Sequence, residues 1–251
     1  MTRRKLIAGN WKMNMKTADG KALAEAVFDK CRPGLPFDIL ICPPMSLLGT
    51  IAGMNRSAGA VGAQDVAEAP KPAGAYTGDI SAEMVKDLGA AYTLVGHSER
   101  RTLHGETDAV VRTKAANAIA AGLTAVVCIG ETLAERESGK TLDVLRTQVN
   151  GSVPPDATAG TCVVAYEPVW AIGTGKVPTN ADVAEAHAAI RAELGKLLGA
   201  ETADALRILY GGSVKPSNAA ELLAIDNVDG ALIGGASLKI EDFWGIAETQ
   251  Q

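Results

Sequence analysis

Short apolar runs alternate with longer alanine- and leucine-rich segments eight times along this chain of 251 residues. Several of the runs are apolar throughout, which is typical of parallel strands covered on both faces. The predicted strands lie at Lys5–Ala8, Phe37–Cys42, Ala60–Ala63, Tyr92–Val95, Thr124–Ile129, Thr161–Tyr166, Arg207–Tyr210 and Gly230–Ile233. Such an alternation predicts parallel strands joined by right-handed crossover helices.

The segments between the strands carry helix-start and helix-stop residues. A helix is predicted over Asn180–Leu198, because a capping residue opens its apolar repeat and a glycine follows it. Thr132 and Glu135 fit a capping box, and Pro216 suits the first turn of another helix. Helices therefore separate the strands.

Eight strand–helix units in a chain of this length favour closure into a (β/α)8 barrel. No low-complexity linker divides the units, so residues 1–251 are expected to form a single α/β domain of eight parallel strands with outer helices. A doubly wound open sheet is the alternative.

Charge and cysteine content limit the partners and the compartment. The formal net charge of −5 disfavours a nucleic-acid or anionic-membrane surface, since both require a dense positive field. Four scattered cysteines are too few for a disulfide framework, and they lack metal-ligand spacing. No segment resembles a signal peptide or a membrane span. We therefore expect a protein of the cytoplasm with no membrane contact and no structural metal.

Polar residues follow several of the predicted strands. Asn10 and Lys12 follow the first strand, His97 and Glu99 the fourth, and Glu167 the sixth. Because the carboxyl ends of parallel strands meet at one rim, these residues are expected to gather there. Each alone has an ordinary alternative as a surface charge, a structural histidine or a strand stop. Together they indicate acid–base chemistry.

Glycine pairs follow the last two strands, in Gly211-Gly212-Ser213 and in Gly234-Gly235. Glycine lets backbone N–H groups approach an anion closely, and a helix N-terminus adds partial positive charge. The loops after strands seven and eight of such barrels frequently bind phosphate. The sequence thus predicts a small phosphorylated substrate.

Two segments look superficially like nucleotide motifs. Ser138-Gly139-Lys140-Thr141 resembles the end of a P-loop, but Ala134 stands where that pattern needs glycine. Gly173-Thr174-Gly175 begins like a dinucleotide fingerprint, but Pro178 stands at its last glycine. Neither ATP nor NAD is expected as a cofactor.

Four blocks of sequence, in chain order, carry a family resemblance. They are Asn10-Trp11-Lys12-Met13-Asn14, Gly96-His97-Ser98-Glu99-Arg100-Arg101, the run from Ala165 to Gly175, and Tyr210-Gly211-Gly212-Ser213. The chain resembles the triosephosphate isomerase family over essentially its whole length. The resemblance implies a TIM barrel that interconverts dihydroxyacetone phosphate and glyceraldehyde 3-phosphate in glycolysis and gluconeogenesis. It also implies that no metal or organic cofactor takes part.

The resemblance assigns catalytic roles by position, as they are known for the family. Glu167 is implied as the base that moves a proton between C1 and C2. His97 is implied as a neutral electrophile, and Lys12 as the cation that offsets substrate and enediolate charge. Asn10 would help to hold the substrate oxygens, and Glu99 would belong to the surrounding polar network.

Phosphate binding is implied for Gly173, Ser213, Gly234 and Gly235. The segment 168–178, called the lid segment below, is implied to close over the substrate and exclude water. Its apolar Trp-Ala-Ile stretch is expected to be exposed in the open state. Apart from Gly173, its members are Pro168, Val169, Trp170, Ala171, Ile172, Thr174, Gly175, Lys176, Val177 and Pro178.

A long connection, Gln64–Gly78, contains two prolines and several glycines or alanines. Loops of this length are usually functional. In the family the corresponding loop reaches into a neighbouring subunit, near its catalytic lysine. Thr77 matches the tip of that loop, so the resemblance implies a homodimer.

Two positions depart from the family pattern. Pro178 has no backbone N–H, whereas relatives with another residue there can donate one to the tyrosine that matches Tyr210. We expect altered lid closure, not lost chemistry. His104 stands where phenylalanine is common, which bears on local packing.

Two rival functions remain from the sequence. One is another phosphate-binding barrel, such as a sugar-phosphate isomerase or an aldolase. An aldolase requires a Schiff-base lysine on a late strand or a metal cluster, and the late strands contain no lysine. The other is a non-catalytic descendant used for binding, in which loss of Lys12, His97 or Glu167 would be expected; all three are present.

Overall fold

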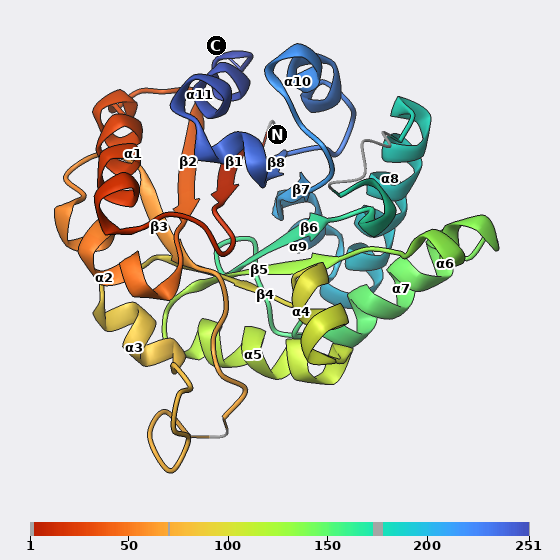
Figure 1. Cartoon of the computed structure of the whole chain (residues 1–251). Coiled ribbons are helices and arrows are strands. Elements are labelled where there is room, and N and C mark those ends of the chain that lie inside the picture. The colour runs from red at the N-terminus through yellow and green to blue at the C-terminus, as the bar shows by residue number, and fades with distance from the viewer. Residues whose placement is uncertain (1–2, 70, 173–177, 251) are drawn as a thin grey trace.

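Eight parallel strands close into a barrel at the centre of the molecule (Figure 1). The computed structural model describes residues 3–69, 71–172 and 178–250. Strands pair in chain order, and the first also pairs with the last through Leu6–Gly230 to Gly9–Ile233. This closure confirms the (β/α)8 barrel, and the open-sheet alternative is wrong. The strands are β1 Lys5–Asn10, β2 Phe37–Cys42, β3 Ala60–Ala63, β4 Tyr92–Val95, β5 Thr124–Ile129, β6 Cys162–Tyr166, β7 Ile208–Tyr210 and β8 Gly230–Ile233.

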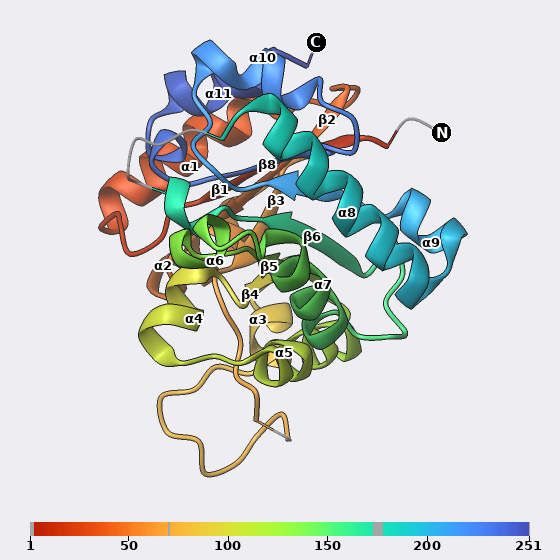
Figure 2. The same cartoon turned by 90° about the vertical axis from the view of Figure 1, so that its right-hand side faces the viewer.

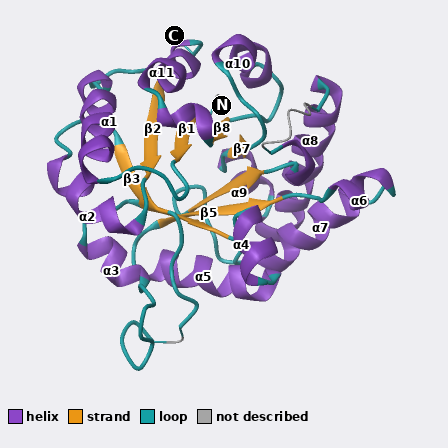
Figure 3. Ribbon diagram, viewed as in Figure 1, coloured by secondary structure: helices purple, strands orange, loops and turns teal. Residues whose placement is uncertain are grey.

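Helices surround the barrel and cover its outer face (Figure 1, Figure 3). Each strand is followed by at least one helical element, as crossovers between parallel strands require. The α-helices are α1 Thr17–Lys30, α2 Met45–Met54, α3 Ala82–Asp87, α4 Ser98–His104, α5 Asp108–Ala120, α6 Leu133–Glu137, α7 Thr141–Ser152, α8 Asn180–Leu198, α9 Ala200–Ala205, α10 Pro216–Leu223 and α11 Ile240–Glu248. Two 3-10 turns are η1 Val169–Ala171 and η2 Gly235–Leu238.

The predicted helix signals match the structure. The helix α8 has the predicted bounds, and Pro216 is the first residue of α10. Thr132 and Glu135 make both halves of the capping box at the start of α6. The local sequence therefore determines where these helices begin.

The first strand ends two residues later than predicted, at Asn10 instead of Ala8. Asn10 pairs with Cys42 of β2, and the next residue, Trp11, donates its backbone N–H to the Cys42 carbonyl at 3.1 Å. The strands β6 and β7 each begin one residue later than predicted. Asn10 thus stands on a strand, and its backbone is fixed by the sheet.

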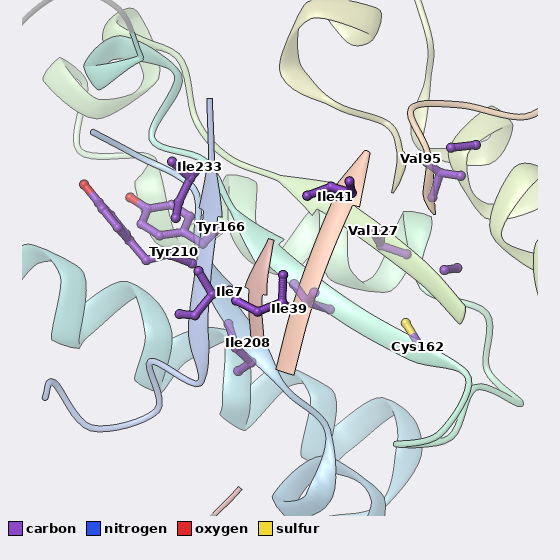
Figure 4. Packing of buried hydrophobic residues seen from close by; sticks show 14 of the residues in the cluster. Ile7, Ile39, Ile41, Val95, Val127, Cys162, Tyr166, Ile208, Tyr210 and Ile233 are labelled. Atoms are coloured by element: carbon purple, nitrogen blue, oxygen red, sulfur yellow. The ribbon is translucent and has the colours of Figure 1, made fainter. Parts of the chain in front are cut away.

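Apolar side chains form two separate clusters, one inside the barrel and one between barrel and helices. Along β1, Leu6 and Ala8 belong to the inner cluster and Ile7 to the outer one, which is the alternation of a strand. Figure 4 shows part of the outer cluster, with Tyr166 and Tyr210 projecting from neighbouring strands. Because side chains fill the interior, a ligand has to bind at one end of the barrel.

The connection between β3 and α3 extends well beyond the ring of helices (Figure 1, Figure 2). Its described residues between Ala69 and Gly78 are exposed, including Thr77. No helix among the described residues is both long enough and apolar enough to cross a membrane.

Candidate active site

The carboxyl ends of the strands surround a cavity of about 350 Å³. Side chains from β1, α4, the loop after β6 and the loops after β7 and β8 meet in it. Of the nine residues predicted for catalysis and phosphate binding, seven line it, namely Asn10, Lys12, His97, Glu167, Ser213, Gly234 and Gly235. Glu99 lies beside the cavity and contacts it through Lys12.

The backbone of Glu167 is held directly after β6. Its N–H donates to the Ile129 carbonyl at 2.7 Å, which continues the pairing with β5. Glycine is required on both sides of it. A Cβ on Gly130 would lie 1.7 Å from the Glu167 carbonyl oxygen, and one on Gly211 would lie 2.7 Å from its Cγ. Neighbouring strands therefore fix Glu167 by close backbone approach.

The carboxylate of Glu167 is 2% exposed and points at two donors from the start of α4. Its Oε1 lies 2.9 Å from His97 Nε2, and its Oε2 accepts the Ser98 N–H at 3.1 Å. Burial raises the pKa of Glu167, but His97, the Ser98 N–H and Lys12 together lower it below its usual value. The carboxylate is therefore ionised at neutral pH and available as a base.

His97 caps α4 and is 5% exposed. Its Nδ1 accepts the Glu99 N–H at 3.2 Å, so Nδ1 carries no proton and the ring proton is on Nε2. Burial lowers the pKa of His97, but the charge and hydrogen bond of Glu167 raise it overall. The two ring nitrogens therefore differ in their contacts. Nδ1 accepts a backbone N–H at the start of α4, and Nε2 faces the cavity.

Lys12 has a φ of +51°, which is rare for a residue with a side chain. Two side chains hold it there: Asn10 Oδ1 accepts its N–H at 3.0 Å, and Gln64 Nε2 donates to its carbonyl at 2.8 Å. Its ammonium lies 2.7 Å from Glu99 Oε1. A strained backbone held by polar side chains is typical of functional sites.

The loop after β8 leaves room for a ligand at Gly235. A Cβ on Gly234 would lie 3.3 Å from Lys12 Cε, whereas one on Gly235 would meet nothing within 4 Å. Gly235 begins the turn η2, so its backbone N–H is at the free end of a helical turn. Ser213 lines the same side of the cavity. Gly173 lies outside the described residues.

Only the two ends of the lid segment are described, because residues 173–177 lie outside the described part; Thr174, Gly175, Lys176 and Val177 are among them. Pro168 and Pro178 are buried, and Val169 is half-buried. The expected exposure of the apolar stretch is wrong for Ala171, which is fully buried. Trp170 and Ile172 are half-buried.

A hydrogen bond fixes the side chain of Trp170: its indole N–H donates to Glu131 Oε1 at 2.8 Å. Tyr166 also donates its hydroxyl to this oxygen, at 3.2 Å. These contacts explain why the segment packs against the protein after Pro168. Ile172 instead lines the cavity.

Sequence reasoning missed Gln64 and Glu131. Each follows a predicted strand, Gln64 directly after the third and Glu131 two residues after the fifth. Both therefore occupy the same kind of position as the residues predicted after the first, fourth and sixth strands. His104, which stands where phenylalanine is common in the family, is the last residue of α4.

The cysteines and the segment that resembles a P-loop lie outside the cavity. All four cysteines are buried and unpaired. Within the described part of the chain, no group of three His, Cys, Asp or Glu residues could hold a metal ion. Ser138-Gly139-Lys140-Thr141 joins α6 to α7 and does not contribute to the cavity lining.

The family model for triosephosphate isomerase matches residues 5–250. A triosephosphate isomerase of Chelativorans sp. (strain BNC1) is 56% identical over 250 residues, covering 98% of this chain and 96% of that protein. One from Rhizobium etli is 56% identical over 249 residues, covering 97% and 94%. The crystal structure of triosephosphate isomerase from Bartonella henselae superposes with a TM-score of 0.89 at 47% identity, covering 98% of both chains.

Proposed function

The chain belongs to the triosephosphate isomerase family, and we propose that the cavity at the carboxyl end of its barrel is the active site. The reaction is the interconversion of dihydroxyacetone phosphate and glyceraldehyde 3-phosphate in glycolysis. The observation that carries the site assignment is the 2.9 Å approach of Glu167 Oε1 to His97 Nε2 inside a cavity bordered by glycine loops.

Glu167 is the base in this proposal. Its carboxylate takes a proton from C1 of dihydroxyacetone phosphate, and the electron pair of that C–H bond forms the C1–C2 double bond. The carbonyl oxygen on C2 then carries the negative charge. His97 Nε2–H gives its proton to that oxygen and takes the proton of the C1 hydroxyl, while Glu167 returns its proton to C2, so that C1 becomes the aldehyde and C2 the alcohol. Burial keeps this base away from water, and its lowered pKa keeps it ionised before substrate binds.

His97 supplies the proton donor for the oxygens. Nε2–H points into the cavity because Nδ1 is occupied by the Glu99 N–H. A substrate cannot fit between two atoms 2.9 Å apart, so its binding has to separate Glu167 from His97. That separation removes the contact that raises the pKa of His97 and favours the neutral ring. A positioned neutral donor then stabilises the oxygen charge as it develops.

Lys12 and Asn10 provide the remaining contacts, to the negative charge and the oxygens of the substrate. The Lys12 ammonium is half-buried and borders the Gly234 loop, so it can reach both an enediolate and a phosphate. Asn10 is fixed at the end of β1. Glu99 orients Lys12 through their 2.7 Å ion pair.

The phosphate is assigned to Ser213, Gly234, Gly235 and Gly173. The first three border one side of the cavity, and the backbone of Gly235 is unobstructed. The lid segment would close over this phosphate, exclude water and protect the enediolate from losing phosphate. Ile172 in the cavity lining supports that placement.

A homodimer fits the surface around the 64–78 connection. A second hollow of about 690 Å³ lies beside it, bordered by the connection and by α4. Met13, next to Lys12, is 97% exposed, and Thr77 is exposed at the tip. A protruding loop, a hollow and an exposed apolar side chain near the active site are expected of a surface covered by a second copy. Sedimentation at low protein concentration tests this.

The cytoplasm is the compartment that fits best. All four cysteines are unpaired and buried, as expected of a protein kept in a reducing environment. The closed barrel and its covering helices also support one domain over residues 1–251.

The experiment is an isomerase assay on glyceraldehyde 3-phosphate with the wild type and Glu167→Asp. Retracting the carboxylate by one methylene is expected to lower kcat on the order of 100-fold. Glu193→Asp on α8, where the carboxylate pairs with Lys196 and Arg146, is the matched control and should retain full activity.

Three outcomes contradict parts of this proposal. An inactive but folded wild type would overturn the reaction and revive the binding-protein alternative. Equal activity in the wild type and Glu167→Asp would remove Glu167 from its role as base. A similar loss in Glu193→Asp would show that shortening any buried carboxylate harms the fold.

A further inference from the structure

Arg136, on the short helix α6, contacts both the amino end of the lid segment and the helix that follows the segment. Its guanidinium carbon lies 4.5 Å from the centroid of the Trp170 ring. Its Nη2 lies 2.9 Å from Asp182 Oδ1 in the first turn of α8. Trp170 belongs to the lid segment and Asp182 lies twelve positions further along the chain, beyond the end of that segment, yet one side chain touches both.

On the first side, Arg136 reinforces the attachment of Trp170. The indole N–H donates to Glu131 Oε1, and the guanidinium Nη1 lies 3.9 Å from the same oxygen. The Val169 N–H donates to the Glu131 carbonyl at 3.1 Å. Arg136 therefore covers the ring and also supports the charge of the group that the ring binds. Val169 and Trp170 lie two and three positions after Glu167 in the sequence.

On the second side, Arg136 reaches the residue that fixes the chain just after the lid segment. Asp182 Oδ2 accepts the Thr179 N–H at 2.9 Å, and Thr179 Oγ1 accepts the Asp182 N–H at 3.2 Å. Thr179 directly follows Pro178. One carboxylate oxygen thus caps α8, and the other pairs with Arg136.

We propose that Arg136 is a positioning residue that ties two flanks to each other, namely residues 169–172 at the amino end of the lid segment and residues 179–183 just after it. This inference rests on the proposed role of residues 168–178, and it uses only the described flanks. With Arg136 in place, the flanks are already ordered before substrate binds. Without it, their ordering has to be supplied by substrate binding, which weakens affinity.

An arginine is suited to this tie, and a lysine is not equivalent. The planar guanidinium can stack on an indole face while its edge donates to a carboxylate. A lysine ammonium can keep one ionic partner but cannot stack as a plane. The guanidinium is 28% exposed, so water screens the ion pair and the expected effect is moderate.

The test compares Arg136→Met, Arg136→Lys and Asp182→Asn with the control Arg146→Met. Arg146 also bridges two carboxylates, Asp143 and Glu193, but it contacts neither flank. For Arg136→Met we expect KM to rise roughly three- to tenfold while kcat changes less than about twofold, the size of a lost surface cation–π contact plus ion pair. Arg146→Met should match the wild type.

Hydrogen exchange locates the effect without using activity. Arg136→Met should speed exchange at residues 169–172 and at residues 179–183. Arg136→Lys should speed it mainly at the first group, because the stack is lost. Asp182→Asn should speed it mainly at the second, because the amide still accepts the Thr179 N–H but no longer pairs with the guanidinium.

The two proposals fail separately. An inactive wild type would overturn the proposed reaction, while the hydrogen-exchange pattern would still test whether Arg136 links the two flanks. Exchange in Arg136→Met that matches Arg146→Met at both flanks overturns the tie. So does faster exchange spread over the whole barrel with a lower Tm, because Arg136 would then be a general stabilising residue.

Discussion

The two ends of the barrel use charged side chains in opposite ways. At the amino ends of the strands, Asp229 pairs with Arg3 at 2.7 Å and with Arg191 at 2.6 Å. Asp38 there pairs with Arg4 at 2.5 Å and Arg207 at 2.9 Å. Each carboxylate is satisfied by two guanidinium groups, and these pairs connect β1, β2, β7 and β8.

At the carboxyl ends, Lys12 and Glu167 each have a side-chain partner, Glu99 and His97, but backbone and amide groups also hold them in place. Lys12 is held in a strained conformation by Asn10 and Gln64, and Glu167 is held by close contact with glycine backbone. Their charged atoms face a cavity. The comparison teaches that charged groups paired with one another away from the cavity stabilise the barrel, whereas charged groups that border the cavity and are also positioned through neutral groups can act on a substrate.

The strongest test of this difference removes a charge at the amino end. Asp229→Asn leaves Arg191 and Arg3 without their shared carboxylate, and Ile208 N–H without its charged acceptor. Breaking a buried pair in this way costs about 3–5 kcal/mol. We expect the free energy of unfolding in urea to fall by that amount, with kcat/KM of the folded fraction unchanged.

Asp143→Asn is the matched control, because its pair with Arg146 is exposed and should contribute less than about 1 kcal/mol. If Asp229→Asn lowered kcat/KM without lowering the free energy of unfolding, the amino-end charges would serve activity and not stability, which contradicts the comparison.

A second test concerns His187, which lies between the two ends. It is fully buried, its Nδ1 is 2.9 Å from the Asn227 carbonyl, and burial lowers its pKa from 6.5 to about 4. Above pH 6.5 the ring is neutral in both states. Between pH 6.5 and 4 the unfolded chain binds a proton and the folded one does not, so stability falls as the pH falls.

The loss over that range is on the order of 3 kcal/mol. Urea unfolding at a series of pH values measures it, and His187→Gln should remove this part of the slope. A slope that is identical in His187→Gln would show that other groups carry the acid sensitivity.

The fold was predictable because its determinants are local and repeated. Continuous apolar runs identify strands covered on both faces, and a capping box such as that of Thr132 and Glu135 sets a helix start without tertiary contacts. Strand ends were less predictable. Asn10 extends β1 because Cys42 on another strand pairs with it, which is a contact the local sequence does not encode.

The site divides along the same line. Glu167, His97 and Lys12 were found because each comes just after a strand, and parallel strands bring such positions together. Their supports were not found, because the bond from Gln64 to the Lys12 carbonyl and that from Glu131 to Trp170 depend on how loops fold back. The burial of Ala171 was mispredicted for the same reason: what covers a loop residue is set by its neighbours in space.

The smallest expected effect comes from Pro178→Ala at the carboxyl end. Tyr210 Oη is buried and has no hydrogen-bond partner among the described residues, and Pro178 has no N–H to offer it. Burial raises the pKa of Tyr210, so its hydroxyl stays protonated. Alanine restores an N–H worth about 1 kcal/mol if it reaches Tyr210, but it also loses proline's restraint on φ, worth about 0.4–1 kcal/mol. Because these contributions oppose each other, we expect kcat/KM to change by less than about threefold.

A double-mutant comparison separates the two contributions. In the Pro178 background, Tyr210→Phe removes a hydroxyl that has no partner among the described residues and should change kcat/KM by less than about twofold. In the Pro178→Ala background the same substitution should cost up to about fivefold, because it then removes a hydrogen bond. Equal effects in both backgrounds would show that position 178 and Tyr210 do not interact. A loss of more than about tenfold in Pro178→Ala alone would make the proline's stiffness a requirement of lid closure, and the carboxyl end would then depend on backbone rigidity beyond Lys12 and Glu167.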